Sequence, residues 1–244
     1  MLAEPSNKTI QGVRETIGVN GKRVQEAVQM LRQWLELQRH LPQEIENGRL
    51  EQMFLRCKAS LERTKKVLDM YYSLRNIIPE VLCDRDPEAP WFARAVKQQI
   101  IVPLPKLTED YSRVTLIRLE NPDPETYSAL DFVKLLFMIE DVRLYEDYFA
   151  SDTIVIDLKG TTLTVAAKWT LPILKKFRMC CEEGYSTRIH VHFGADCQKK
   201  LLSYRNWFLE QEKVKTDESR RPTKKVSRCD LFGFEGSFRT LSLD

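Results

Sequence analysis

Apolar residues recur at helical spacing through the first third of the chain. Residues 22–39 place four aliphatic side chains three or four positions apart: Val24, Val28, Leu31 and Leu35. This spacing predicts one amphipathic helix. After a polar break, the pattern predicts a short helix around Leu50–Cys57 and a longer helix that ends at Pro79. We therefore expect residues 1–82 to form a helical N-terminal module.

The pattern changes after this module. Residues 83–110 are rich in proline and charge, which is typical of a connector, with one short helix near Trp91–Val96. Beyond the connector, the β-branched content of Val114–Leu119 predicts a strand. Thr153–Leu158 is apolar on both faces except for Asp157, as expected of a central strand in a parallel sheet.

Helices are predicted between and after these strands. With Asp123 as N-cap and Pro124 as the first helical residue, the pattern predicts a helix that is apolar nearly all round through Leu135–Ile139. The next helix starts at Leu163 and contains Pro172, which is predicted to kink or restart it, with Thr170 as the new cap. Both helices follow a strand, as in β-α-β units.

The last part of the chain predicts a third strand, Ile189–Phe193, and an amphipathic helix, Leu201–Lys215, followed by a charged segment that we expect to be mobile. We divide this half into an α/β domain over residues 111–200 and a C-terminal helix and tail over residues 201–244. The predicted fold class is α/β, with a helical module joined to a small, mostly parallel sheet flanked by helices.

Composition narrows the class of protein. The chain has 244 residues, of which 43% are hydrophobic and 30% charged, as is ordinary for a soluble protein of one or two domains. A net charge of +3 argues against nucleic-acid binding. There is no apolar leader, no run of about 18 apolar residues and no CxxC among the six cysteines. We therefore expect a cytoplasmic protein with reduced thiols.

Catalytic and metal-binding motifs are absent from the sequence. There is no GxSxG, P-loop, GxGxxG or HExxH motif, and Asp157 has no paired base, so we expect neither an enzyme nor a bound cofactor. His190 and His192 would share one face of a strand and could reach one metal ion. No third ligand stands at a convincing spacing, so we predict no metal site.

Several stretches taken in order resemble the CRAL-TRIO lipid-binding family. They include FLRCKASLERTKKVLDMYYSLRNIIPE, RVTLIRLENPDPETYSALDFVKLLFMIED and TIVIDLKGTTL. The resemblance covers roughly residues 22–190 and 205–244, and is strongest to insect members similar to α-tocopherol transfer protein and retinaldehyde-binding protein.

The resemblance implies a fold and a function. The family packs a helical module on a sheet-floored pocket, which holds one hydrophobic molecule under a mobile gate helix. Tocopherol-, retinoid- or phospholipid-like ligands are carried between membranes, in some members with phosphoinositide-dependent docking. We therefore expect a monomeric carrier of a small hydrophobic ligand that associates transiently and peripherally with acidic membrane surfaces.

The chain departs from the family pattern after Arg188. There the family continues with a strand and the gate helix, whereas this chain passes directly to Ile189–Phe193. One strand, one helix and a loop amount to about 30–50 residues. We interpret the departure as an internal deletion, by splicing or through the gene model. The alternative function is therefore a truncated form without ligand transfer, which acts as an interaction or membrane-docking module or is unstable.

The candidate ligand-binding residues lie on two helices and one strand. Phe132, Leu136 and Ile139 have the i, i+4, i+7 spacing of one helix face, and Ile154 and Ile156 share one face of their strand. The resemblance adds three residues of the following helix: Phe177, Cys180 and Cys181. The alternative is that all of these residues belong to an ordinary hydrophobic core.

Three basic residues are candidate phosphoinositide contacts, again by resemblance: Arg56, Lys58 and Arg188. Lysine and arginine side chains that converge on one phosphate bind it through charge-assisted hydrogen bonds. The alternative is that they are ordinary surface charges in a chain with 38 lysines and arginines.

Overall fold

The computed structural model describes residues 4–120, 122–157, 161–185 and 202–222. Its N-terminal part is helical, as predicted, and contains α1 (Asn7–Ile17), α2 (Gly21–Glu36), α3 (Asn47–Arg56), α4 (Leu61–Ile77) and α5 (Pro79–Leu82). Hydroxyl or amide side chains cap α1, α2 and α4 by accepting a backbone N–H, and these caps are Ser6, Asn20 and Ser60. Helix α1 was not predicted from the sequence.

The predicted connector contains regular structure. Helix α6 (Pro90–Gln98) confirms the short helix expected there, but strand β1 (Gln99–Leu107) was missed. Strand β1 contains Pro103 and Pro105, which have no N–H to donate to a neighbouring strand and are more typical of a loop. They are tolerated because β1 is an edge strand that pairs on one side with β2.

The sheet is small and mixed. Strand β2 (Ser112–Leu119) pairs antiparallel with β1 and parallel with β3 (Ser151–Asp157), giving the order β1-β2-β3. The sequence had predicted a mostly parallel sheet. Within the described residues β3 is the outermost strand, whereas the sequence pattern predicted a central one. The predicted third strand, Ile189–Phe193, lies outside the described residues.

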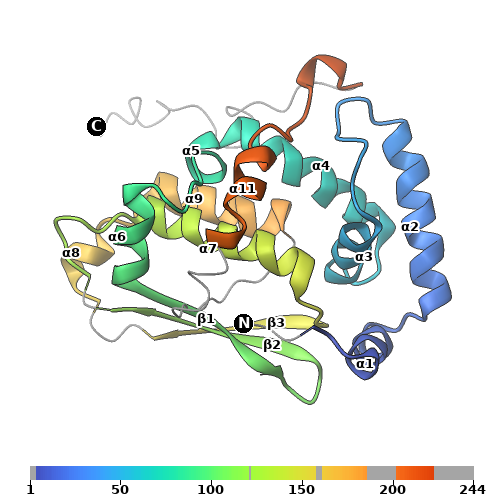
Figure 1. Ribbon diagram of the computed structural model, residues 1–244, viewed down its shortest axis with the longest axis horizontal. Helices are drawn as coiled ribbons and strands as arrows, with labels where there is room; N and C mark the ends of the chain where they lie inside the picture. The colour runs from blue at the N-terminus through green and yellow to red at the C-terminus, as the bar shows by residue number, and fades with distance from the viewer. Residues whose placement is uncertain (1–3, 121, 158–160, 186–201, 223–244) are drawn as a thin grey trace, which may run out of the picture.

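Helix α7 (Ala129–Glu146) lies between the sheet and the N-terminal helices (Figure 1). It is buried nearly all round, as its apolar composition predicts. Its predicted start was wrong: Ser128 is the N-cap, accepting the N–H of Asp131. Asp123 instead closes a preceding turn by accepting from the Glu125 N–H and the Thr126 hydroxyl.

The chain after β3 follows the predicted order. The helix is divided in two, α8 (Leu163–Ala166) and α9 (Leu171–Met179). Helix α9 has Thr170 at its N-cap and Pro172 in its first turn. A π-helical turn, η1 (Cys180–Gly184), extends α9. The last helix, α11 (Arg205–Gln211), is shorter than the predicted Leu201–Lys215.

Candidate ligand-binding wall and the buried charges beside it

A chain of aromatic rings joins α7 to the α8–α9 segment. The ring of Trp169 lies 5.1 Å from that of Phe132 and 5.9 Å from that of Phe177, both edge to face. The Phe177 ring lies 6.4 Å from that of Phe137. The structure therefore brings together Phe132 and Phe177, two of the predicted wall residues. Their link is Trp169, which the sequence analysis missed.

The other predicted wall residues on helices are deeply packed. Leu136 and Cys180 have no exposed surface, and Ile139 and Cys181 are also buried. Burial raises the pKa of both cysteine thiols, so neither is a reactive thiolate. These positions fit a wall and a plain core equally, so their role as ligand contacts stays a prediction.

The two predicted strand residues lie in β3. Ile154 pairs in register with Thr115, and Ile156 pairs with Ile117. Ile117 is buried, whereas 54% of Ile156 is exposed. The side chain of β2 is therefore buried at this position, whereas the neighbouring side chain of β3 is half exposed to solvent. The Asp157 carboxylate comes next and forms a salt bridge at 3.6 Å with the Arg118 guanidinium.

A network of buried charges fixes α7 to its surroundings. Fully buried Asp141 accepts hydrogen bonds from the Tyr71 hydroxyl at 2.6 Å, the Arg85 Nη1 at 2.7 Å and the Tyr185 hydroxyl at 2.9 Å. Burial alone would raise the pKa of Asp141, but Arg85 and Arg75 hold it below its usual range. Asp141 is therefore a carboxylate with its charge compensated.

Arg143 links the same helix to the sheet. Its guanidinium contacts Glu140 at 2.5 Å, Asp147 at 3.2 Å and Asp152 of β3 at 2.8 Å. Asp147 also pairs with Arg113 of β2 at 2.6 Å. Burial raises the pKa of Asp152 to about 6, against the lowering effect of Arg143 and with a smaller contribution from nearby Glu140.

Two of the three predicted phosphoinositide residues have internal partners. The Arg56 Nη1 lies 3.2 Å from a Glu140 oxygen, and its guanidinium lies 4.8 Å from the centre of the Phe149 ring. The Lys58 ammonium donates to the Ala150 carbonyl, although the residue as a whole is exposed. Arg188 lies outside the described residues, as do His190 and His192. A phosphate at Arg56 would have to compete with Glu140.

An exposed apolar and basic surface covers α8 and α9. Leu163 is 90% exposed, Leu171 60% and Leu174 43%. Lys175 and Arg178 are also exposed and follow Leu171 and Leu174 at i, i+3, i+4, i+7 spacing, which places all four on one face of α9. We call this set, Leu163, Leu171, Leu174, Lys175 and Arg178, the α8–α9 surface.

The sequence reasoning missed most of the buried charges. The acidic and basic residues near the end of the otherwise apolar helix α7 could have indicated them. Their partners, however, come from elements far apart in the sequence. Among the described residues, no cluster of histidine, cysteine or acidic side chains could hold a metal ion. Nor does that part of the chain contain a helix long and apolar enough to cross a membrane.

Two families match the chain. Residues 97–203 match the CRAL/TRIO domain, and residues 20–92 match the Pinta-like, UBA domain. The first match begins just before β1 and the second spans α2 to the start of α6. No curated protein gives a significant match.

Proposed function

We propose that this protein, which carries a CRAL/TRIO domain behind a helical N-terminal region, binds and transfers a small hydrophobic molecule. The observation that carries the proposal is the CRAL/TRIO match over the sheet, α7 and α9, since this domain generally binds lipophilic ligands and not substrates for catalysis. Tocopherol-, retinoid- and phospholipid-like molecules are the ligand classes we propose.

The proposed contacts are apolar residues of α7, β3 and the segment from α8 to η1. Phe132 and Phe177, joined by Trp169, would form one wall, and Ile156 at the open end of β3 would contact the ligand from the sheet. Ile154 and the deeper Leu136, Ile139, Cys180 and Cys181 complete the proposed set. The driving force is apolar area removed from water, about 25 cal/mol per Å².

Release of the ligand would take place at a membrane. The α8–α9 surface places leucines beside Lys175 and Arg178, which suits a bilayer with anionic headgroups. Lys58 and Arg188 are the proposed phosphoinositide contacts. Arg56 is the third proposed contact, and its buried guanidinium already pairs with Glu140.

The test is to purify the protein from eukaryotic cells and identify its bound lipids by mass spectrometry. We expect about one hydrophobic molecule per chain in the wild type. Ile156→Arg should lower that ratio without altering the thermal melt, because Ile156 is half exposed. Leu37→Arg is the matched control, since Leu37 is 76% exposed on the N-terminal module. A folded wild type that carries no lipid would overturn the proposal.

A second candidate function is that of a truncated form that docks without transferring a ligand. The position of β3 as the outermost described strand, with 44% of Val155 and 54% of Ile156 exposed, favours it. An unpaired strand edge beside exposed apolar residues invites pairing between chains, and this candidate requires that of β3. Size exclusion and thermal melting decide the matter: a monomer with a sharp melt would contradict this candidate, and oligomers with a broad melt would support it.

A further inference from the structure

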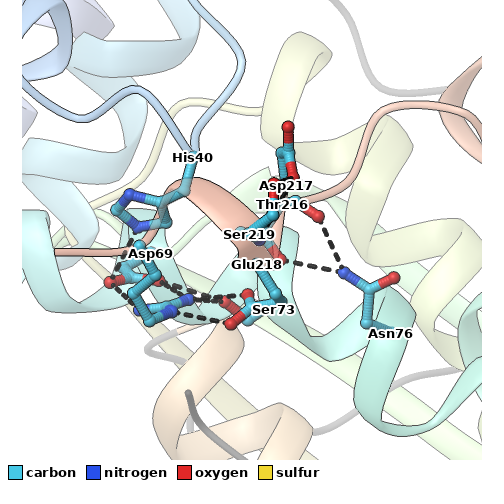
Figure 2. Close-up of polar contacts among 9 residues, drawn as sticks. His40, Asp69, Ser73, Asn76, Thr216, Asp217, Glu218 and Ser219 are labelled. Atoms are coloured by element: carbon cyan, nitrogen blue, oxygen red, sulfur yellow. Dashed lines mark hydrogen bonds and ion pairs between the residues drawn. The ribbon is translucent and has the colours of Figure 1, made fainter. Parts of the chain in front are cut away.

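The segment after α11 is docked on the N-terminal module, although its charged sequence predicted mobility. We call residues 216–221 the strap. They include the 3-10 turn η2 (Glu218–Arg220) and lie against α4 and the loop at His40 (Figure 2). Docking therefore joins the C-terminal part of the chain to a helix about 140 residues earlier in the sequence, since Asn76 pairs with Thr216.

Backbone and amide groups hold the first half of the strap. The Asp217 N–H donates to the His40 carbonyl at 2.7 Å. The Asn76 side-chain amide donates to the Thr216 carbonyl at 3.1 Å and to its hydroxyl at 2.9 Å, as Figure 2 shows. An amide that recognises a carbonyl and a neighbouring hydroxyl fixes both the register and the direction of the strap.

One arginine holds the second half. The Arg221 guanidinium makes two 2.8 Å hydrogen bonds to the Asp69 carboxylate and a third, also 2.8 Å, to the Ser73 hydroxyl. Its Nε contacts Glu218 within the strap at 2.8 Å. The Arg221 side chain is only 5% exposed. Such a bidentate pair is both strong and geometrically selective.

The strap differs from α11 in what holds it. Helix α11 is anchored by apolar burial, with Phe208 fully buried and the Trp207 ring 5.4 Å from that of Tyr145. The strap buries Thr216 and the Arg221 side chain, and its contacts are hydrogen bonds and ion pairs. Segments with little apolar burial open at lower free energy than the core. We therefore expect the strap to open at a lower free energy than α11.

We propose that the face formed by Asp69, Ser73, Asn76 and the His40 carbonyl is a docking site for a short peptide that makes one 3-10 turn and carries an arginine after it, and that the strap is its occupant within the same chain. The occupant is identified by its contacts: a Thr carbonyl and hydroxyl at Asn76, a backbone N–H at His40 and a guanidinium at Asp69. Undocking of the strap leaves the site open to a partner peptide of the same chemistry. This inference does not depend on ligand transfer.

The Asp217 amide reports on docking, because its acceptor is the His40 carbonyl. Hydrogen exchange of the full chain should show this amide protected in the wild type. Arg221→Ala should lower that protection by about tenfold or more, as expected for loss of a charge-assisted pair. Lys213→Ala is the matched control, since that side chain is 71% exposed and pairs with Glu210 outside the strap. Equal effects of the two substitutions, or an unprotected Asp217 in the wild type, would overturn the proposal.

A second measurement tests the site itself. A synthetic peptide of residues 213–222, KVKTDESRRP, should bind to the Arg221→Ala chain, whose own strap is weakened. Adding Asp69→Asn to that chain should weaken the binding, and a peptide with alanine in place of Arg221 should not bind. Circular dichroism checks that each variant is folded. Failure of the peptide to bind, or binding that ignores Asp69, would contradict a docking site.

Discussion

The Asp141 carboxylate lies 2.7 Å from the Arg85 guanidinium, and neither side chain is exposed. Asp141 belongs to α7 and Arg85 to the segment between α5 and α6, so the pair fixes the sheet-bearing half of the protein to its helical module. Isolated charges are costly to bury, and this pair is stabilised by the two tyrosine hydroxyls that also donate to Asp141.

Asp141→Asn should therefore destabilise the fold strongly. Removing one partner of a buried ion pair costs about 3–5 kcal/mol, because the remaining charge stays buried without compensation. Urea denaturation measures the change in the free energy of unfolding. Glu182→Gln is the control, since the Arg178–Glu182 pair is largely exposed and should contribute little. A loss at Asp141 no larger than in the control would show that the network does not hold α7.

The buried pair also shows where prediction from sequence ends. The helical module, β2, β3 and the restart at Thr170 were predictable, because local apolar spacing and proline positions determine them. The partners of Asp141 were not, since Tyr71, Arg85 and Tyr185 come from three separate elements. Strand β1 was missed because its prolines are acceptable only at an edge, and edge position is a property of the whole sheet.

The same limit applies to the candidate site. Phe132, Leu136 and Ile139 lie on one helix and are buried, but helical spacing does not separate a ligand wall from a core. Trp169, the ring that connects Phe132 with Phe177, precedes Thr170 in a turn where no periodic pattern operates. The docking of Arg221 on Asp69 joins residues 152 positions apart, and charge composition alone predicted mobility there.

Asp152 should make stability depend on pH. Its folded pKa of about 6 exceeds the usual unfolded value of about 3.9, so the folded state binds more protons between these values. The contribution of Asp152 to stability is therefore greatest below about pH 4 and is lost as pH rises through 6. Relative to Asp152→Asn, the wild type should lose on the order of 2 kcal/mol between pH 4 and 7.

Denaturation curves of both proteins across this range measure the difference. Asp110→Asn is a suitable control, because hydrogen bonds from Thr108 and Ser112 lower the pKa of this exposed carboxyl and its effect lies at lower pH. A difference between wild type and Asp152→Asn that stays constant from pH 4 to 7 would contradict the raised pKa.

Ala59 should be replaceable by glycine with a gain in stability. It follows α3 with a φ of 58°, a left-handed conformation that is strained for a residue with a Cβ atom. Ala59→Gly should relieve about 1 kcal/mol of strain, less the loss of its partial apolar contact. Ala95→Gly inside α6 should instead destabilise the fold. Thermal melts of the two variants should therefore shift in opposite directions, and a parallel decrease would contradict this reading of the turn.

The α8–α9 surface should be required for membrane binding. Leu163→Asp with Leu171→Asp replaces two exposed leucines by acidic residues, so it should remove apolar insertion and add repulsion from anionic headgroups. We expect co-sedimentation with phosphatidylserine vesicles to fall at least tenfold, with an unchanged melt because neither side chain is packed. Leu37→Asp, at a residue that is 76% exposed at the C-cap of α2, should bind as the wild type does. Replacing part of the phosphatidylserine with a phosphoinositide at equal total charge then separates the two proposed contacts. Tighter binding that is lost in Lys58→Ala would support headgroup recognition at Lys58, whereas unchanged binding would leave the leucine surface as the docking element and contradict a specific phosphoinositide site.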